Sequence, residues 1–280
     1  MAGPELAQFW TDSKQDGRRY KHPHTGEFVP SVTTITGMED KPNLIQWAAD
    51  LTLRWAIENW NTLGQRSDQQ AMNWGKYRWR DVRDERALVG TESHAWVEAD
   101  LTGSWDYPIL SEEAQQCVEQ WMKLRASHDI KPRYVETTAW NHTDGWAGTL
   151  DLACELDGIL TLGDVKTSKG LWEGHKMQIA ALANAEVYMV KQEDGTWIEV
   201  EPPSYDRYSF FHIRPDYYDP MREQTTPAYW EVVDLDADEI PSLYEQFLGY
   251  RKVWGAQQDL NTLRKEKKKA SEQVAKIEEW

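Results

Sequence analysis

The stretch Gly148–Thr167, which reads GTLDLACELDGILTLGDVKT, decides the fold. Two runs of mainly apolar residues flank Asp157-Gly158, and Asp-Gly between two such runs is the strongest short-range signal of a β-hairpin. A two-residue turn at this point fixes the register of the two strands. That register sets Asp151 directly opposite Asp164, with Cβ atoms about 4.5–5.5 Å apart.

One face of this predicted hairpin is acidic. Because successive side chains of a strand point to opposite faces, Lys166 shares the face of Asp164. The opposite, core-facing side of the first strand holds Leu150, Leu152, Cys154 and Leu156. Carboxylates directly opposite one another repel unless a cation neutralises them, and oxygen ligands suit Mg²⁺ or Mn²⁺. The alternative is a solvated pair of acids with Lys166 in a surface salt bridge.

A third carboxylate, Glu136, lies on the preceding strand, which we expect over Tyr134–Trp140. In one register of the turn at Asp144-Gly145, Glu136 lies opposite Asp151. In a register with a tighter turn, Glu136 lies opposite Ala153. Both registers keep Glu136 near the acidic pair, so it is a candidate metal ligand, although an edge-strand glutamate is usually only solvated.

The hairpin lies within a longer series of helices and strands. Helical spacing of apolar residues predicts helices over 42–60, 68–86 and 90–101, and a fourth from the N-cap Ser111 to a stop before Pro132. After the hairpin we expect a helix over 171–190, then strands at 196–200, 208–214 and 229–234, and then a helix over 236–254. We therefore expect an α/β fold in which helices flank a central mixed β-sheet.

No internal repeat, Gly/Ser linker or Pro-rich tract divides the chain. We expect a single domain over residues 1–255, with a helical N-terminal part (1–130) and a sheet core (131–255). A charged helical tail would follow over residues 256–280.

The negative net charge of the chain by itself disfavours binding to nucleic acid. Its 280 residues include 31 Lys or Arg and 47 Asp or Glu, a formal net charge of −16. The charge is uneven, because residues 251–280 hold eight basic and five acidic side chains, or +3, which leaves −19 for the rest. The basic run Arg264–Lys269 could hold a phosphate backbone, but a solvated helical tail is the more common meaning.

Other features bear on location. No apolar run is long enough to span a membrane, and the first twenty residues lack the apolar core of a signal peptide. Cys117 and Cys154 are far apart and outside any metal-binding spacing. We therefore expect two reduced thiols in a cytoplasmic protein that does not bind membranes.

Five segments, taken in order, resemble the PD-(D/E)XK nucleases and, within them, the RecB-type exonuclease branch. Gly148–Asp151 is followed by Asp164–Thr167 (DVKT), and Gln178 lies in the next predicted helix. Upstream, Gly90–His94 (GTESH) matches the G-T-x-x-H signature of the branch. Pro30–Ile35 (PSVTTI) is similar to a segment near the start of phage-encoded and mitochondrial genome-maintenance exonucleases.

The resemblance implies a restriction-endonuclease-like core that holds one or two divalent metals, Mg²⁺ or Mn²⁺. The implied metal ligands are His94, Asp151, Asp164 and the backbone carbonyl of Val165, and Glu136 remains a candidate. A metal ion held by these ligands would lower the pKa of a water molecule bound to it.

Three further roles follow from the resemblance. Lys166 would orient or deprotonate the attacking water and stabilise the charge of the reacting phosphate. Gln178 would place Lys166 or the substrate, and Thr167 would take part in substrate binding.

The chain departs from the family pattern in three ways. Leu150 stands where the family name has proline, which is ordinary for this branch. Leu182 stands where a tyrosine is expected, which puts a DNA contact in doubt. The cluster-binding cysteines of some relatives are also absent, so we expect no iron–sulfur cluster.

A basic and aromatic segment precedes the G-T-x-x-H signature. Cations interleaved with aromatic rings are typical of single-strand binding, and Lys76, Arg78, Trp79 and Arg80 are candidate DNA contacts at the mouth of the site. An ordinary helix with its aromatic residues facing the core is an equally good interpretation.

The sequence thus predicts a metal-dependent DNA exonuclease that acts on ends or single strands, in phage-type recombination, replication or genome processing. Its partners would be DNA and, in addition, a recombination or replication protein. A structure-specific endonuclease with the same site is one alternative. A module that binds DNA ends or partners and carries a vestigial nuclease site is another.

Overall fold

A seven-stranded mixed sheet forms the centre of the computed structural model, which describes residues 10–13, 17–192, 194–219 and 224–278. Its strand order is β12-β9-β6-β5-β4-β7-β8, in which β6 and β9 run parallel and all other neighbours are antiparallel. The strands are β4 (Ile130–Asn141), β5 (Trp146–Leu156), β6 (Ile159–Lys166), β7 (Val187–Lys191), β8 (Trp197–Val200), β9 (Arg207–Arg214) and β12 (Tyr229–Leu235). The expected α/β class with a mixed sheet is confirmed.

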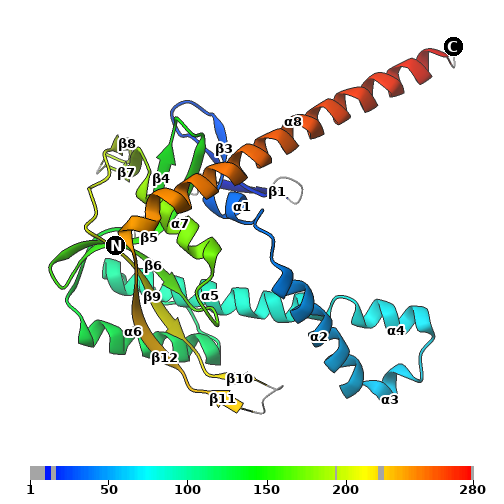
Figure 1. Cartoon of the computed structure of the whole chain (residues 1–280), viewed down its shortest axis with the longest axis horizontal. Helices are drawn as coiled ribbons and strands as arrows, with labels where there is room; N and C mark the ends of the chain where they lie inside the picture. Colours follow the sequence, from blue (N-terminus) through cyan, green and yellow to red (C-terminus); the bar gives the residue numbers. More distant parts are fainter. Residues whose placement is uncertain (1–9, 14–16, 193, 220–223, 279–280) are drawn as a thin grey trace.

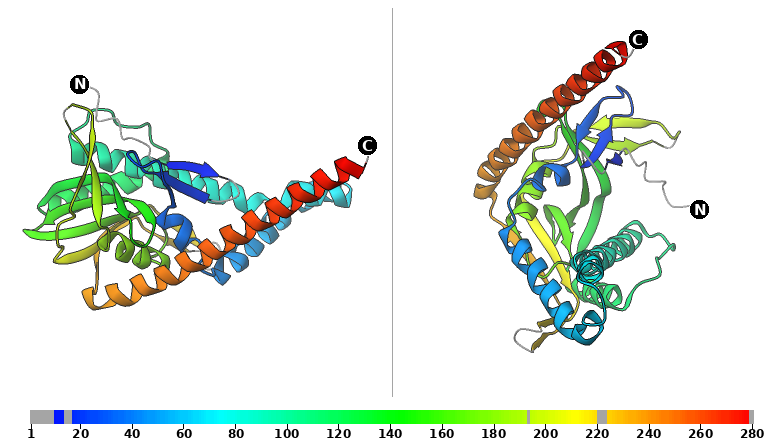
Figure 2. Two further views of the ribbon diagram at one scale, coloured as in Figure 1. Left: turned by 90° about the horizontal axis from the view of Figure 1, so that it is seen from above. Right: turned by 90° about the vertical axis from the view of Figure 1, so that its right-hand side faces the viewer.

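Helices cover both faces of this sheet (Figures 1 and 2). On one face, α1 (Val32–Thr36), α7 (Glu173–Ala183) and the first turns of α8 (Ile240–Glu278) build a core around Leu162. On the other face, α5 (Arg78–Thr102) and α6 (Glu112–Ser127) build a second core. The second core includes Cys117 and Cys154, which are free thiols as expected.

Smaller elements surround the main sheet. A three-stranded antiparallel sheet consists of β1 (Trp10–Ser13), β2 (Gly17–Lys21) and β3 (Phe28–Pro30), and a hairpin consists of β10 (Tyr217–Asp219) and β11 (Gln224–Thr226). The helices α2 (Pro42–Glu58), α3 (Trp60–Leu63) and α4 (Asp68–Gly75) form an arm at the N-terminal end of α5 (Figure 1). Within the described residues, no helix has the length and apolar character that a membrane span requires.

The hairpin register predicted from Asp157-Gly158 is confirmed. Leu156 pairs with Ile159, and the same register continues to Leu152 with Gly163. Asp157 and Gly158 both have positive φ, 53° and 86°, as a type I′ turn requires.

The neighbouring hairpin takes the first of the two predicted registers. Asn141 pairs with Trp146, and this register holds on both sides of Glu136, at Val135 with Leu152 and at Thr137 with Leu150. No regular pair forms at Glu136 itself.

This interruption divides the predicted core face of β5. Leu150, Leu152, Cys154 and Leu156 are all buried, as expected. Leu150, however, packs in the core beneath α1 and α7, whereas the other three pack beneath α5 and α6. The strict alternation assumed from the sequence therefore fails next to the irregular pair.

Several helix boundaries differ from the predicted ones. The predicted helix 171–190 ends at Ala183, and Val187–Lys191 instead forms the strand β7. The sequence predicted a break between helices 68–86 and 90–101. In the structure the break lies at Lys76-Tyr77, between α4 and α5, and α5 then continues as one helix. The predicted boundary at residue 255 falls inside α8, which runs on as one helix of 39 residues.

The segment Pro30–Ile35 positions the start of β5. Ser31 is the N-cap of α1, and its side chain accepts a hydrogen bond from the backbone N–H of Thr34. Val32 then packs on Gly148, where an added Cβ would lie 2.8 Å from Val32 Cγ2. A glycine is therefore required at 148 for α1 to lie this close to the sheet.

Candidate metal site

A cleft of ≈ 1150 Å³ opens where α5 passes the middle of β4 and the first half of β5. Its walls come from α5, β2, the start of α1, β4, β5 and the hairpin of β7 and β8. Five of the residues predicted for the site line it. The cleft is lined by His94, Glu136, Asp151, Lys166 and Gln178.

Asp151 lies at the end of the regular β5–β6 ladder and remains partly exposed. Its Oδ2 accepts a hydrogen bond of 2.8 Å from the backbone N–H of Val165. This contact ties the carboxylate to the neighbouring strand just beyond the last regular pair, Leu152 with Gly163, and the predicted pair of Asp151 with Asp164 is not part of the regular ladder. Asp151 is therefore held in place by backbone geometry.

Asp164 is buried beside Asp151, with 1% of its surface exposed. Its Oδ2 forms an ion pair of 2.5 Å with Lys166 Nζ, and neither carboxylate oxygen has a regular hydrogen bond among the described residues. Burial raises the pKa of Asp164 to about 7; the Lys166 ammonium opposes this shift, and the Asp151 carboxylate adds to it.

Lys166 is also largely buried. Burial disfavours its ammonium form, but the surrounding carboxylates of Asp164, Asp151 and Glu136 outweigh this effect and raise the pKa of Lys166. The side chain therefore forms a buried ion pair at the floor of the cleft.

Glu136 has an unusual backbone conformation for a residue inside a strand. Its φ is +44°, a left-handed value that costs a side-chain-bearing residue roughly 1–2 kcal/mol. Burial raises the pKa of Glu136 well above its usual range, and the charges of Asp151, Glu98 and Asp164 raise it further. Strain of this kind is typical of functional sites, where the surrounding structure holds an unfavourable conformation in place.

His94 completes the group from the middle of α5. Its Nδ1 lies 3.7 Å from Asp151 Oδ2. Burial lowers the pKa of His94, while Asp151 and a hydrogen bond with the Val165 backbone partly oppose that shift. A neutral imidazole is the form that binds a metal ion.

The ligand atoms of His94, Glu136 and Asp151 all lie within 4.8 Å of one another. The structure thus brings together three of the predicted ligands, from α5, β4 and β5. Asp164 is not part of this trio but is close enough to Asp151 for the two carboxylates to interact. Oxygen ligands with one imidazole are suited to Mg²⁺ or Mn²⁺.

The predicted DNA contacts Lys76, Arg78, Trp79 and Arg80 are not among the residues that line this cleft. Arg80 precedes His94 by fourteen helix positions, which at 1.5 Å per residue is about 21 Å, and the α5 wall of the cleft begins between them at Ala87. Trp79 lines a shallow groove on α2, and Arg78 forms an ion pair with Asp81. The expectation that Lys76, Arg78, Trp79 and Arg80 lie at the mouth of the site therefore stays a prediction.

Thr167 does not line the cleft itself but lies beside a residue that does. A Cβ added to Gly90, a lining residue on α5, would lie 3.5 Å from Thr167 Oγ1.

Sequence reasoning missed several lining residues. Glu98 follows His94 by four residues, so it lies on the same face of α5, and burial raises the pKa of Glu98. That spacing was readable from the sequence. The cations Arg18, Arg133 and Lys191 also line the cleft, but they come from three separate strands and had no local signal.

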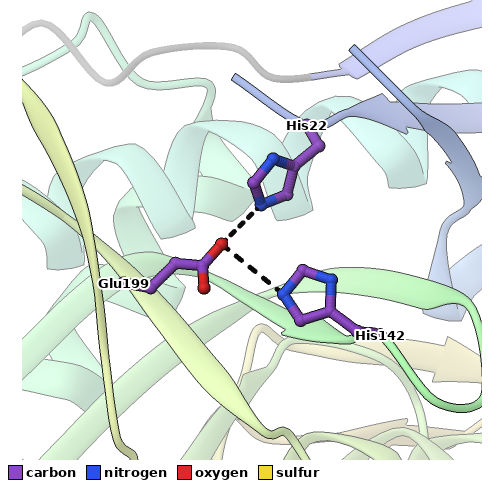
Figure 3. A group of neighbouring side chains, drawn as sticks. All are labelled: His22, His142 and Glu199. Carbon is purple, nitrogen blue, oxygen red and sulfur yellow. Dashed lines mark hydrogen bonds and ion pairs between the residues drawn. The ribbon is translucent and has the colours of Figure 1, made fainter. Parts of the chain in front are cut away.

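A second group of possible ligands lies outside the cleft (Figure 3). Glu199 Oε1 is 2.7 Å from His22 Nε2 and 3.5 Å from His142 Nε2. The backbone N–H groups of His24 and Thr25 donate to His22 Nδ1, so the proton of this ring is on Nε2 and points at Glu199. A metal ion would need the lone pair of that nitrogen, so this group is a hydrogen-bonded contact between β8 and the end of β2.

Comparison with known proteins adds no assignment. Neither the models of protein families nor the curated protein sequences contain a match to this chain.

Proposed function

We propose that this chain is a divalent-metal-dependent deoxyribonuclease of the PD-(D/E)XK type, with a restriction-endonuclease-like core, that removes nucleotides from DNA ends or single strands. The observation that carries the proposal is the trio His94, Glu136 and Asp151 beside the buried Asp164–Lys166 pair. Phage-type recombination, replication or genome processing in a bacterial cytoplasm is the setting we propose.

The donor set fits a divalent cation. Four carboxylates meet near the cleft floor, those of Glu98, Glu136, Asp151 and Asp164, and Lys166 is the cation paired with them. The buried Asp164 carboxylate without a regular hydrogen bond and the raised pKa values of Asp164 and Glu136 indicate that the charge of this cluster is not fully balanced by the described residues. A cation would relieve the repulsion.

His94, Asp151 and Glu136 would hold the ion, with Asp164 and the Val165 carbonyl as further ligands. When bound, such an ion lowers the pKa of a water ligand and neutralises charge on the phosphate. The strand-to-strand hydrogen bond from Val165 to Asp151 keeps the ligand carboxylate oriented without any ion.

Lys166 would act on the substrate phosphate. The ion pair with Asp164 holds its Nζ at the cleft floor, where an ammonium group can donate to a phosphate oxygen and stabilise developing charge. Gln178 lines the same cleft from α7 and offers an amide that can orient either the phosphate or Lys166.

DNA would lie along the basic and aromatic rim. Arg18, Arg133 and Lys191 can contact phosphates, and Tyr20, Tyr134 and Trp197 offer ring faces for unpaired bases. A local group of cations is sufficient for binding near a metal site, even in a chain of net charge −16. Residues 76–80, at the start of α5, would contact the DNA farther from the metal site.

The test compares three proteins on three DNA forms. Wild type, Lys166→Ala and the control Lys131→Ala are incubated with linear, closed circular and single-stranded DNA in Mg²⁺, Mn²⁺ or EDTA. Lys131 is exposed on β4 and pairs with Asp129, outside the cleft. We expect metal-dependent release of nucleotides from linear and single-stranded DNA by wild type and Lys131→Ala, and a loss of at least about a hundredfold in Lys166→Ala.

Each contrary outcome has a definite meaning. Cutting of closed circles would replace the exonuclease proposal by an endonuclease. No metal-dependent cutting of any form would leave a DNA-binding module, and full activity of Lys166→Ala would remove Lys166 from the chemistry.

A further inference from the structure

The C-terminal helix α8 is much longer than its packing against the sheet requires. Leu243 and Phe247, in its first turns, are buried in the core. Farther along the helix, three large apolar side chains are half exposed: Val253 (50%), Leu260 (50%) and Leu263 (52%). Figures 1 and 2 show this part of α8 projecting beyond the sheet.

These exposed residues follow a heptad repeat. With Val253 as position a, the a positions are Val253, Leu260, Lys267 and Val274, and the d positions are Ala256, Leu263, Ala270 and Ile277. Apolar residues at a and d over three to four heptads indicate a coiled coil. A helix that is surrounded by solvent on all sides does not require apolar residues at heptad spacing.

The body of the protein contacts the opposite side of the helix. Arg251 Nε donates to the Gly145 carbonyl at 2.9 Å, and the Arg19 guanidinium lies 5.2 Å from the Trp254 ring. Arg19 also donates to Gln258 Oε1 at 3.1 Å. In the heptad these three helix residues occupy positions f, b and f, which lie opposite a and d. The a and d positions from Val253 to Ala270 are therefore exposed and free of these contacts.

The flanking charges are complementary to a second copy of the same helix. In a parallel pair, the residue at g lies beside the residue at e of the next heptad in the other chain. Asp259 is at g and Arg264 is at the following e, so two such pairs of opposite charge form by symmetry. Lys267 is the one charged residue at a, a placement that fixes register, and its long stem can carry the ammonium to the edge of the seam.

We propose that this chain forms a homodimer through a parallel, in-register coiled coil of α8 over residues 253–278. The proposal does not depend on nuclease activity, because none of the seam residues lines the cleft. It would place two clefts at one end of a shared stalk.

Molar mass in solution tests the proposal directly. Sedimentation equilibrium is run over nanomolar to high micromolar concentrations on wild type, Leu260→Glu/Leu263→Glu and the control Asn261→Glu/Thr262→Glu. The control adds the same charge to the same turn at the outer positions b and c. We expect wild type and control to reach twice the chain mass, and the seam variant to associate more than about a hundredfold more weakly.

A charge swap tests the parallel arrangement. Asp259→Arg should weaken association by roughly fivefold to tenfold, and Asp259→Arg/Arg264→Asp should restore it. Circular dichroism on every variant checks that the helix content is unchanged. A wild type of single-chain mass at all concentrations, or association that survives in the seam variant, overturns the dimer, and failure of the double swap to restore affinity overturns the parallel arrangement.

Discussion

Glu136 combines a left-handed backbone with a carboxylate that faces three others. Its φ of +44° and its raised pKa are both unfavourable to folding of the chain without metal. Because the raised pKa means that the folded chain holds this proton more tightly than the unfolded chain, stability contributed by this group is present below about pH 4.5 and is lost as the pH rises.

The first prediction follows from that sign. In EDTA, Glu136→Gln should be more stable than wild type at about pH 8, and the gain should shrink towards zero at about pH 5. Glutamine keeps the shape and the backbone strain but cannot ionise, so only the charge changes. Urea unfolding at the two pH values measures the difference in free energy of unfolding.

Glu155→Gln serves as a control because its effect on stability near neutral pH should have the opposite sign. Its hydrogen bond with Arg133 lowers the pKa of Glu155, so its carboxylate stabilises the fold above that pKa, and its loss should destabilise the chain near neutral pH. A gain in Glu136→Gln that is equal at both pH values would mean that charge repulsion at Glu136 is not the cause.

At the residue scale, the predictable part of the site is the part that one hairpin determines. The turn at Asp157-Gly158 was sufficient to predict the register as far as Leu152 with Gly163, which brings Asp151 and Asp164 close enough to interact, and the placement of Lys166 beside Asp164 followed from strand alternation. Arg18 and Lys191 were out of reach, because their approach to the cleft depends on the packing of separate strands. The left-handed conformation of Glu136 also has no sequence signal, since glutamate rarely adopts it.

Among the elements, the pairing of β6 with β9 depends on a close approach at Gly163. A Cβ on Gly163 would lie 2.2 Å from Phe211 Cε2, inside the core beneath α5 and α6. Phe211 is fully buried, so its ring has little room to move.

We predict that Gly163→Ala destabilises the fold by about 1–3 kcal/mol, the usual range for an overpacked core. The control is Gly249→Ala in α8, where nothing lies within 4 Å of the added Cβ and alanine favours the helix by up to about 1 kcal/mol. Chemical unfolding of both variants measures the effect. If Gly163→Ala unfolds at the wild-type denaturant concentration, the ring of Phe211 is free to move and the close contact does not limit the core.

The element boundaries that sequence reasoning placed wrongly have local causes. The segment 171–190 has apolar residues throughout, and periodicity does not separate a buried helix from a buried strand within such a run. Pairing with β4 and β8 decides that Val187–Lys191 is a strand. By contrast, the hairpins around β5 were predictable because the turn residues carry the signal themselves.

On the scale of the whole molecule, the net charge of −16 is unevenly placed. The cleft gathers carboxylates from α5, β4, β5 and β6, and the exposed half of α8 carries the basic run Arg264–Lys269. Folding without metal therefore concentrates like charge in one region, and ion binding to that region should stabilise the molecule as a whole.

The last prediction concerns that stabilisation. A ligand that binds only the folded chain adds about 2.7 kcal/mol at one hundred times its dissociation constant, and a chain of this size gains roughly 2–4 °C in Tm per kcal/mol. We therefore expect saturating Mn²⁺ to raise the Tm of wild type by several degrees over EDTA, and to leave the Tm of Asp151→Asn nearly unchanged. The exposed Asp40→Asn serves as the matched control and should shift like wild type. Differential scanning calorimetry without DNA keeps the measurement independent of nuclease activity. An equal shift in Asp151→Asn and wild type would place the ion elsewhere on this acidic surface and would remove the cleft as the metal site.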